Sequence, residues 1–168
     1  MARYHDGLFQ KNYDTNAFMN NIKGIKNIQV ITHNMYEEEV EMSPIDYVAR
    51  AVLLLSKTPK QLNLFHCFND KVIPTGAIID VLNSRGNDIK VVSNDEFKEI
   101  YKKNMNDNIQ GIVISDMSLD IFDDDESDIL LKNEFTSNIL KMLDVTWPLP
   151  DAKYLKILIS NLIDVGFL

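Results

Sequence analysis

The sequence lacks the residues that build nucleotide-binding turns and covalent cross-links. Its glycines are too scattered to form the glycine-rich turn with which a strand and a helix hold a pyrophosphate. The single cysteine, Cys67, excludes an internal disulfide and agrees with a reducing compartment. No tyrosine is followed four residues later by a lysine, which would lower the phenol pKa for proton donation. We therefore do not expect this chain to reduce a substrate alone.

Long apolar runs and basic clusters are also missing. No run approaches the roughly 20 residues that span a bilayer, and Met1–Gly7 lacks the apolar stretch of a signal peptide. We expect a cytoplasmic protein that does not enter a membrane. The net charge of −8 repels nucleic acid, so we expect no nucleic-acid partner. His5, His33 and His66 have no metal-ligand spacing, so no metal site is expected, and His66 is expected to be a hydrogen-bonded core residue.

The composition of the sequence predicts one compact unit. Its 45% apolar and 25% charged residues match ordinary globular proteins, and 168 residues are too few for two ordinary domains. We treat residues 1–168 as a single unit that contains an acidic loop at residues 116–128. Asp123, Asp125 and Ser127 of this loop, together with Glu134 after it, match positions of a calcium loop, but Asp128 replaces its glycine. A solvated loop is the expectation.

Helical spacing of apolar residues predicts the first two long helices. Asp14 or Thr15 can cap a short helix with inward positions Phe18, Ile22 and Ile25. Ser43 can cap a second helix that has Pro44 in its first turn. That helix carries a stripe that we expect to be buried, at Ile45, Val48, Ala49, Val52 and Leu53.

The following segments alternate between strands and helices. Residues 62–68 and 89–92 are predicted strands, and a helix at residues 75–83 lies between them. Asn94 is the predicted cap of the next helix, and two further helices are expected at residues 134–143 and after Asp151. Cys67, in an apolar run, is expected in the core. The predicted fold class is therefore α/β, mixed and helix-rich.

Several stretches resemble, in order, one known family. Residues 3–10 (RYHDGLFQ) resemble the segment after the Rossmann core in terminal thioester reductase domains of nonribosomal peptide synthetases. Residues 43–51 (SPIDYVARA) resemble that group's Thr-Pro-Val-Asp helix start, and residues 65–69 (FHCFN) resemble its His-Leu-Phe-Asn strand end. Gly86 with the strand and helix after it, and the closing Gly166–Phe167, also match. The related carboxylic acid and aminoadipate reductases share this architecture.

The resemblance implies the C-terminal, substrate-side subdomain of an extended short-chain dehydrogenase fold, without its Rossmann core. In the intact domain NADP(H) would be bound mainly by the N-terminal half, so this chain is expected to hold no cofactor and no catalytic residue. The implied partners are that Rossmann portion, a phosphopantetheinylated carrier domain and its acyl or peptidyl thioester. The thioester would be released as an aldehyde or alcohol.

The same resemblance places five residues nearest the cleft, where they would bind substrate. Phe9 would form an apolar wall, and Gln10 or Asn12 would donate hydrogen bonds to the substrate; Tyr4 and Asp6 complete the set. The alternative is that Phe9 is core and the polar residues only shape a turn.

Other residues have mainly structural interpretations. Asp46 is expected to interact with N–H groups of the first helical turn. Tyr47 and Tyr101 are expected to pack, and Met35 and Met42 to fill core or line an acyl pocket.

Two rival functions stay open from the sequence. One is a non-catalytic docking module for a carrier or a neighbouring synthetase domain. The other is a fragment of a sugar-nucleotide epimerase or dehydrogenase, which would need basic residues for a diphosphate where only Arg3, Arg50 and Arg85 are available. If the Rossmann half is missing, an apolar face should be exposed, and self-association is then expected.

Overall fold

The computed structural model describes residues 3, 6, 8, 13–62, 64–104 and 132–168. Helices dominate, and four three-residue strands accompany them, which confirms the helix-rich α/β prediction. In chain order the elements are η1 (Tyr13–Thr15), α1 (Ala17–Ile28), β1 (Val30–Thr32), α2 (His33–Glu37), β2 (Glu39–Glu41), α3 (Ile45–Leu55), β3 (Val72–Pro74), α4 (Thr75–Asn83), β4 (Lys90–Val92), α5 (Asn94–Asn104), α7 (Glu134–Met142) and α8 (Ala152–Asp164).

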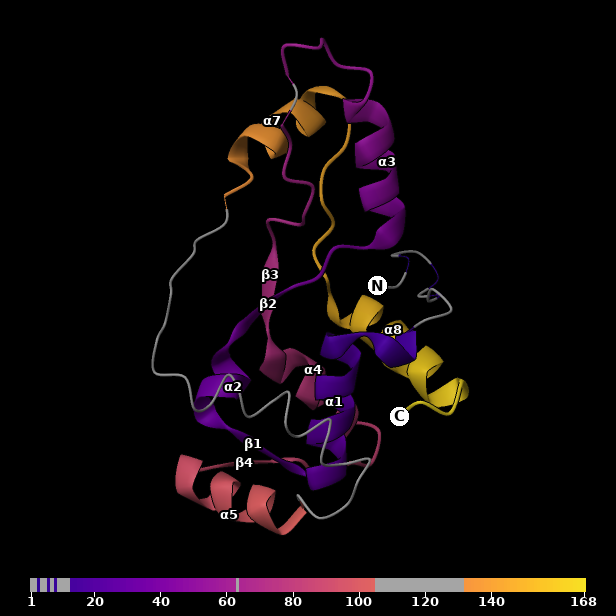
Figure 1. Ribbon diagram of the computed structural model, residues 1–168. Helices are drawn as coiled ribbons and strands as arrows, with labels where there is room; N and C mark the ends of the chain where they lie inside the picture. The colour runs from indigo at the N-terminus through magenta and orange to yellow at the C-terminus, as the bar shows by residue number, and fades with distance from the viewer. Residues whose placement is uncertain (1–2, 4–5, 7, 9–12, 63, 105–131) are drawn as a thin grey trace.

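The elements form a larger body and a smaller lobe (Figure 1). In the larger body, α1, α4, α5 and α8 surround one apolar core that includes Ile31, Ile78 and Leu158. In the smaller lobe, α3 and α7 pack around Ala51, Leu140 and Trp147. We call these the main body and the α3–α7 lobe.

Two small ladders replace a continuous sheet. Strands β1 and β4 pair in parallel, with Val30 opposite Lys90, and β2 and β3 pair antiparallel, with Val40 opposite Ile73. The β2–β3 ladder lies between the main body and the α3–α7 lobe (Figure 1). Its strands were not predicted, because three residues are too few to establish an alternating pattern.

Helix α1 is longer than predicted and has a different cap. Asn16, and neither Asp14 nor Thr15, accepts the hydrogen bond from the Met19 N–H, at 3.1 Å. Asp14 and Thr15 lie in η1 instead. The helix ends where Gln29 adopts a left-handed conformation, with φ of 59°. Ile22 and Ile25 are buried as predicted.

Helix α3 confirms the predicted bounds but not the predicted buried face. Ala51 and Leu55 face the core of the α3–α7 lobe, whereas Val52 and Leu53 are 54% and 60% exposed. The helix is apolar on nearly every side, so its periodicity could not say which face packs within this chain. The Ser43 cap is also wrong, since no side chain caps α3.

The strand predicted at residues 62–68 is wrong. Its described residues, 62 and 64–68, pair with no strand among the described parts of the chain. A strand exists only through ladder hydrogen bonds with a neighbour. The apolar sequence is therefore suited to a strand but lacks a neighbouring strand here.

The second half of the chain largely confirms the predictions. Helix α4 spans the predicted residues, and Asp151 caps α8 by accepting from the Tyr154 N–H at 2.8 Å. The cap of α5 differs, because the Ser93 hydroxyl, one residue before Asn94, accepts from the Glu96 N–H at 3.3 Å. No helix among the described residues is long and apolar enough to cross a membrane.

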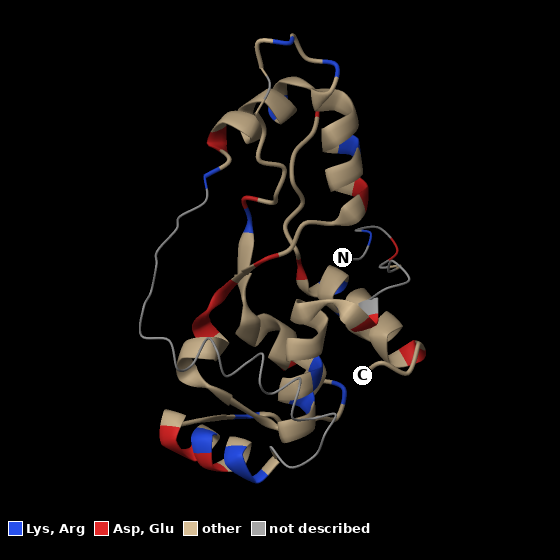
Figure 2. Ribbon diagram, viewed as in Figure 1, with Lys and Arg blue, Asp and Glu red and all other residues tan. Residues whose placement is uncertain are grey.

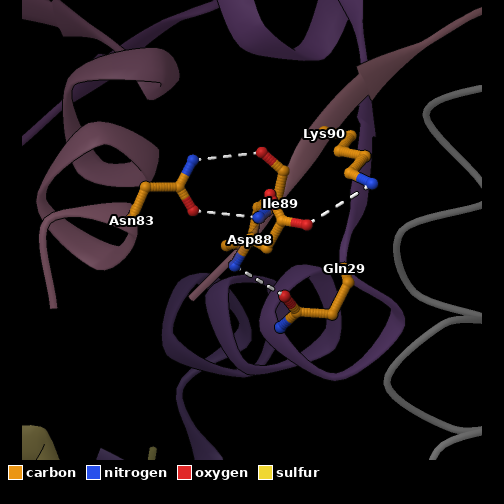
Figure 3. Close-up of polar contacts among 5 residues, drawn as sticks. All are labelled: Gln29, Asn83, Asp88, Ile89 and Lys90. Carbon is orange, nitrogen blue, oxygen red and sulfur yellow. Dashed lines mark hydrogen bonds and ion pairs between the residues drawn. The ribbon is translucent and has the colours of Figure 1, made fainter. Parts of the chain in front are cut away.

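Three hydrogen bonds and one ion pair fix the turn between α4 and β4 (Figure 3). Asn83 exchanges two hydrogen bonds with the backbone of Ile89, at 3.0 and 2.9 Å. The Asp88 N–H donates to Gln29 Oε1 at 3.0 Å, and Lys90 pairs with the Asp88 carboxylate at 3.4 Å. These contacts join the end of α1 to the start of β4.

Candidate functional site

An open groove of about 680 Å³ lies on the α3–α7 lobe. The C-terminal half of α3 supplies Val52 and Leu55, and the turn after it supplies Thr58 and Lys60. Residues 64–68, which pair with no described strand and which we call the unpaired segment, supply Leu64 and Phe65. The lining is mainly apolar, with Leu64 71% exposed. An apolar groove with few polar groups favours an acyl chain or a protein surface over a charged ligand.

The groove belongs to a weakly charged surface. Among the eleven residues of α3 only Asp46 and Arg50 are charged, whereas α5 carries charges of both signs (Figure 2). Contiguous exposed apolar patches mark interaction sites in globular proteins. The exposed side of α3 is therefore a candidate interface.

Cys67 lies in the groove wall and is only partly buried. It packs against the core of the α3–α7 lobe and is not inside it, contrary to the prediction from the sequence. Burial raises the pKa of the Cys67 thiol. The thiol is therefore neutral at neutral pH, which disfavours a nucleophilic role. His66 is exposed and not a core residue; its backbone N–H donates to Thr136 Oγ1 at 2.9 Å.

Of the five predicted substrate-binding residues, the structure describes Asp6 alone. Its carboxylate accepts from the Leu8 N–H at 3.0 Å and pairs with Arg3 at 2.5 Å. Its carbonyl accepts from Asn161 of α8 at 3.2 Å. These contacts shape a turn next to the main body. Tyr4, Phe9, Gln10 and Asn12 lie outside the described residues, so their position at a cleft stays a prediction.

The residues that were expected to have structural roles make structural contacts. Asp46 accepts from the Tyr47 N–H at 3.2 Å, as expected for the first turn of a helix. Tyr101 is buried in the main body, and Tyr47 packs against the core of the α3–α7 lobe. Met42 is fully buried in the core of the main body and does not line the groove, while Met35 packs against that core.

Sequence reasoning missed the buried Asn69, which joins the two parts of the molecule. Its Nδ2 donates to the carbonyls of Met42 and Pro148, at 3.0 and 2.9 Å. Its N–H donates to the Ser43 hydroxyl at 2.7 Å, and its Oδ1 accepts from the Lys71 N–H at 3.0 Å. The sequence indicated only a turn here, since asparagine is common in turns.

The described residues contain no group of three or more metal-ligating side chains. The acidic loop at residues 116–128 lies outside them, together with Asp123, Asp125 and Ser127. Glu134, the last position of the calcium-like spacing, is described and begins helix α7.

The comparisons with known proteins identify the fold. No protein-family model matches the sequence, and no curated protein matches it. Among solved structures the chain is similar to a thiolation-reductase di-domain from an archaeal non-ribosomal peptide synthetase, with 48% identity and a TM-score of 0.88. That match covers 99% of this chain and 34% of that one.

Two more distant structures show the same fold. The terminal R domain from the myxalamid PKS-NRPS biosynthetic pathway is 18% identical, with a TM-score of 0.80, and the match covers 100% of this chain and 42% of that one. The reductase domain of the aureusimine biosynthetic cluster is 18% identical, with a TM-score of 0.79, over 99% and 43% of the two chains.

The fold is thus that of a portion of a terminal reductase domain. At 48% identity over nearly its whole length, this chain corresponds to part of the terminal reductase domain of a nonribosomal peptide synthetase. The resemblance found in the sequence is therefore confirmed. The chain spans about a third of the length of the archaeal di-domain.

Proposed function

We propose that this chain is the C-terminal, substrate-side portion of an NADPH-dependent thioester reductase. The intact domain would release a carrier-bound acyl or peptidyl thioester as an aldehyde or alcohol. The observation that carries the proposal is the 48% identity to the archaeal thiolation-reductase di-domain over 99% of this chain. The reductase class implies a nicotinamide cofactor.

The sequence indicates that cofactor binding and proton donation belong to another portion of the domain. This chain has neither a glycine-rich pyrophosphate turn nor a Tyr and Lys spaced four residues apart. NADP(H) and the proton donor therefore belong to the portion that this chain does not span. When bound, NADPH would supply the hydride, and the proton donor of that other portion the proton, that together convert the thioester into an aldehyde and the free carrier thiol. The portion present would cover the cleft, exclude water and orient the thioester.

The structure supports a specific surface for the missing portion. The exposed face of α3, with Val52 and Leu53, adjoins the unpaired segment at residues 64–68. A sheet in the rest of the domain could cover the apolar helix face, and its edge strand could form ladder hydrogen bonds with the extended segment. We infer that the rest of the reductase domain packs here.

A carrier domain that bears a phosphopantetheine thioester is the second proposed partner. The archaeal relative joins a thiolation domain to its reductase, which favours a substrate delivered on such an arm. The sugar-nucleotide alternative has less support. Arg3 is paired with Asp6, and Arg85 donates to Ser160 of α8 at 2.5 Å, so both of these arginine side chains are already engaged within this chain.

Reconstitution tests the proposal. The chain would be mixed with the polypeptide encoded immediately upstream, and complex formation would be followed by size-exclusion chromatography and NADPH binding by fluorescence. We expect a 1:1 complex that binds NADPH, whereas this chain alone does not. A chain that forms no complex with that portion would contradict the proposal. A complex that forms but never reduces a thioester would favour the docking-module alternative.

A further inference from the structure

A small cavity between α7 and the connector after it carries polar groups that the proposed function does not use. Its volume is about 70 Å³, and Ser137, Lys141, Thr146 and Trp147 line it together with Asp70 and Lys71. Ser137 and Lys141 are four residues apart on α7, which places both on one face of that helix. The cavity is separate from the apolar groove, with which it shares no lining residue.

Two lining side chains are buried with an unpartnered polar atom. Ser137 is 4% exposed and Trp147 is 2% exposed, yet Ser137 Oγ and Trp147 Nε1 have no hydrogen-bond partner among the described residues. Leaving a buried polar group unpaired is costly, so each such group in a folded protein calls for an explanation. An indole N–H can only donate, so Trp147 requires an acceptor.

The charges around the cavity favour an anionic acceptor. Lys71 donates through Nζ to the Trp147 carbonyl at 2.7 Å, which leaves two of its three ammonium hydrogens for other acceptors. Lys141 adds a second positive charge to the lining, and the exposed Asp70 is its only carboxylate. Besides Asp70, the residues that line the cavity thus carry an indole N–H, two hydroxyls and two ammonium groups.

We propose that this cavity binds a small oxyanion, such as a phosphate group. Its volume suits one tetrahedral oxyanion, and charge-assisted hydrogen bonds from two lysines would offset the dehydration of the anion. Two water molecules, at about 30 Å³ each, would also fill it. Water needs no positive charge nearby, so a dependence on Lys141 separates the two occupants.

The test uses the fluorescence of Trp147, which is the only tryptophan in the sequence. Inorganic phosphate would be titrated into the whole chain at constant ionic strength, with sodium chloride as the balancing salt. We expect a saturable change in emission, and an increase of about tenfold or more in the dissociation constant for Lys141→Gln, because charge-assisted hydrogen bonds are the strong ones. Lys141 is exposed, so the variant should fold.

Three controls separate specific binding at the cavity from other effects of charge or ligand size. Lys153→Gln makes the same charge change at an exposed site on α8 and should leave the titration unchanged. Lys141→Arg keeps the cation and should retain most of the affinity. Free phosphopantetheine, titrated in the same way, tells whether the anion is taken up free or as part of a larger ligand. An emission change no larger than that of chloride, or an unaltered Lys141→Gln titration, would overturn the proposal and leave ordered water as the occupant.

Discussion

The side-chain amide of Asn69 donates to the backbone carbonyl of Pro148 at 2.9 Å, across 79 residues of chain. The same nitrogen donates to Met42, in the core of the main body, while Pro148 follows Trp147 of the α3–α7 lobe. One fully buried amide therefore connects the cores of both parts. This connection is one of the contacts that hold the α3–α7 lobe, with its groove, against the main body.

Replacing Asn69 should destabilise the whole chain. In Asn69→Ala the buried Ser43 hydroxyl keeps its backbone donor, but the carbonyls of Met42 and Pro148 lose theirs. Buried groups left unpaired cost roughly 1–3 kcal/mol each, so we expect the two carbonyls to lower the free energy of unfolding by about 2–6 kcal/mol. Urea denaturation measures it. Asn27→Ala, at an exposed position of α1, is the matched control and should change stability little.

Gly76→Ala should also be destabilising, although alanine favours helices. A Cβ at this position would lie 2.5 Å from ring carbons of Tyr36, whose hydroxyl donates to Asp80 at 2.9 Å. Moving the ring breaks that hydrogen bond. The helix-propensity gain of about 1 kcal/mol is therefore outweighed by an overpacking cost of about 1–3 kcal/mol.

A double-mutant cycle checks the cause of this loss. In a Tyr36→Ala background the ring is gone, so Gly76→Ala should become neutral or stabilising in thermal or urea denaturation. Equal losses in both backgrounds would show that the ring of Tyr36 is not responsible.

Cys67 should react slowly with alkylating reagents at neutral pH. Burial raises the pKa of this thiol, and only the thiolate is nucleophilic. The rate of iodoacetamide labelling should therefore increase through a higher pH range than that of a free cysteine. The stability that the neutral thiol contributes is present below the unfolded-state pKa and is lost as pH increases through the folded-state pKa. A pH–rate profile that matches a free thiol would contradict this account.

A negative charge on the exposed face of α3 should weaken binding of the missing portion. Val52 is 54% exposed in this chain and is expected to be buried in the intact domain. Val52→Glu should therefore leave the isolated chain stable but reduce affinity for that portion at least about tenfold, the cost of burying an unpaired charge. Val165→Glu, after α8 and 51% exposed, is a control of the same residue type. Calorimetric titration against the upstream polypeptide compares them.

The sequence was sufficient to predict those helices whose apolar faces are buried against other parts of this same chain. Helices α4 and α8 have local caps or stops and faces buried by their own chain, so periodicity located them. Helix α3 shows the limit of that reasoning, because its bounds were predicted while its buried face was not. Val52 and Leu53 follow a core-like spacing, but a pattern cannot say whether the residues that cover it belong to the same chain.

The same limit applies to the candidate site. The apolar segment at residues 62–68 has strand character without a ladder partner in the described structure, so the strand prediction was wrong. Asn69 was missed because its four hydrogen bonds join segments up to 79 residues away, which local turn chemistry does not reveal. Family resemblance, in contrast, anticipated the similarity to reductase domains because it compares the order of several motifs.

The most direct test of the central claim is reductase turnover on recombination. The chain, the upstream polypeptide and NADPH would be combined with a pantetheine thioester, and the loss of NADPH would be followed by absorbance together with aldehyde formation. The account predicts turnover only when both polypeptides are present, reduced by Val52→Glu and not by Val165→Glu. Full turnover by the upstream polypeptide alone, or none from a well-formed complex on any thioester, would contradict it.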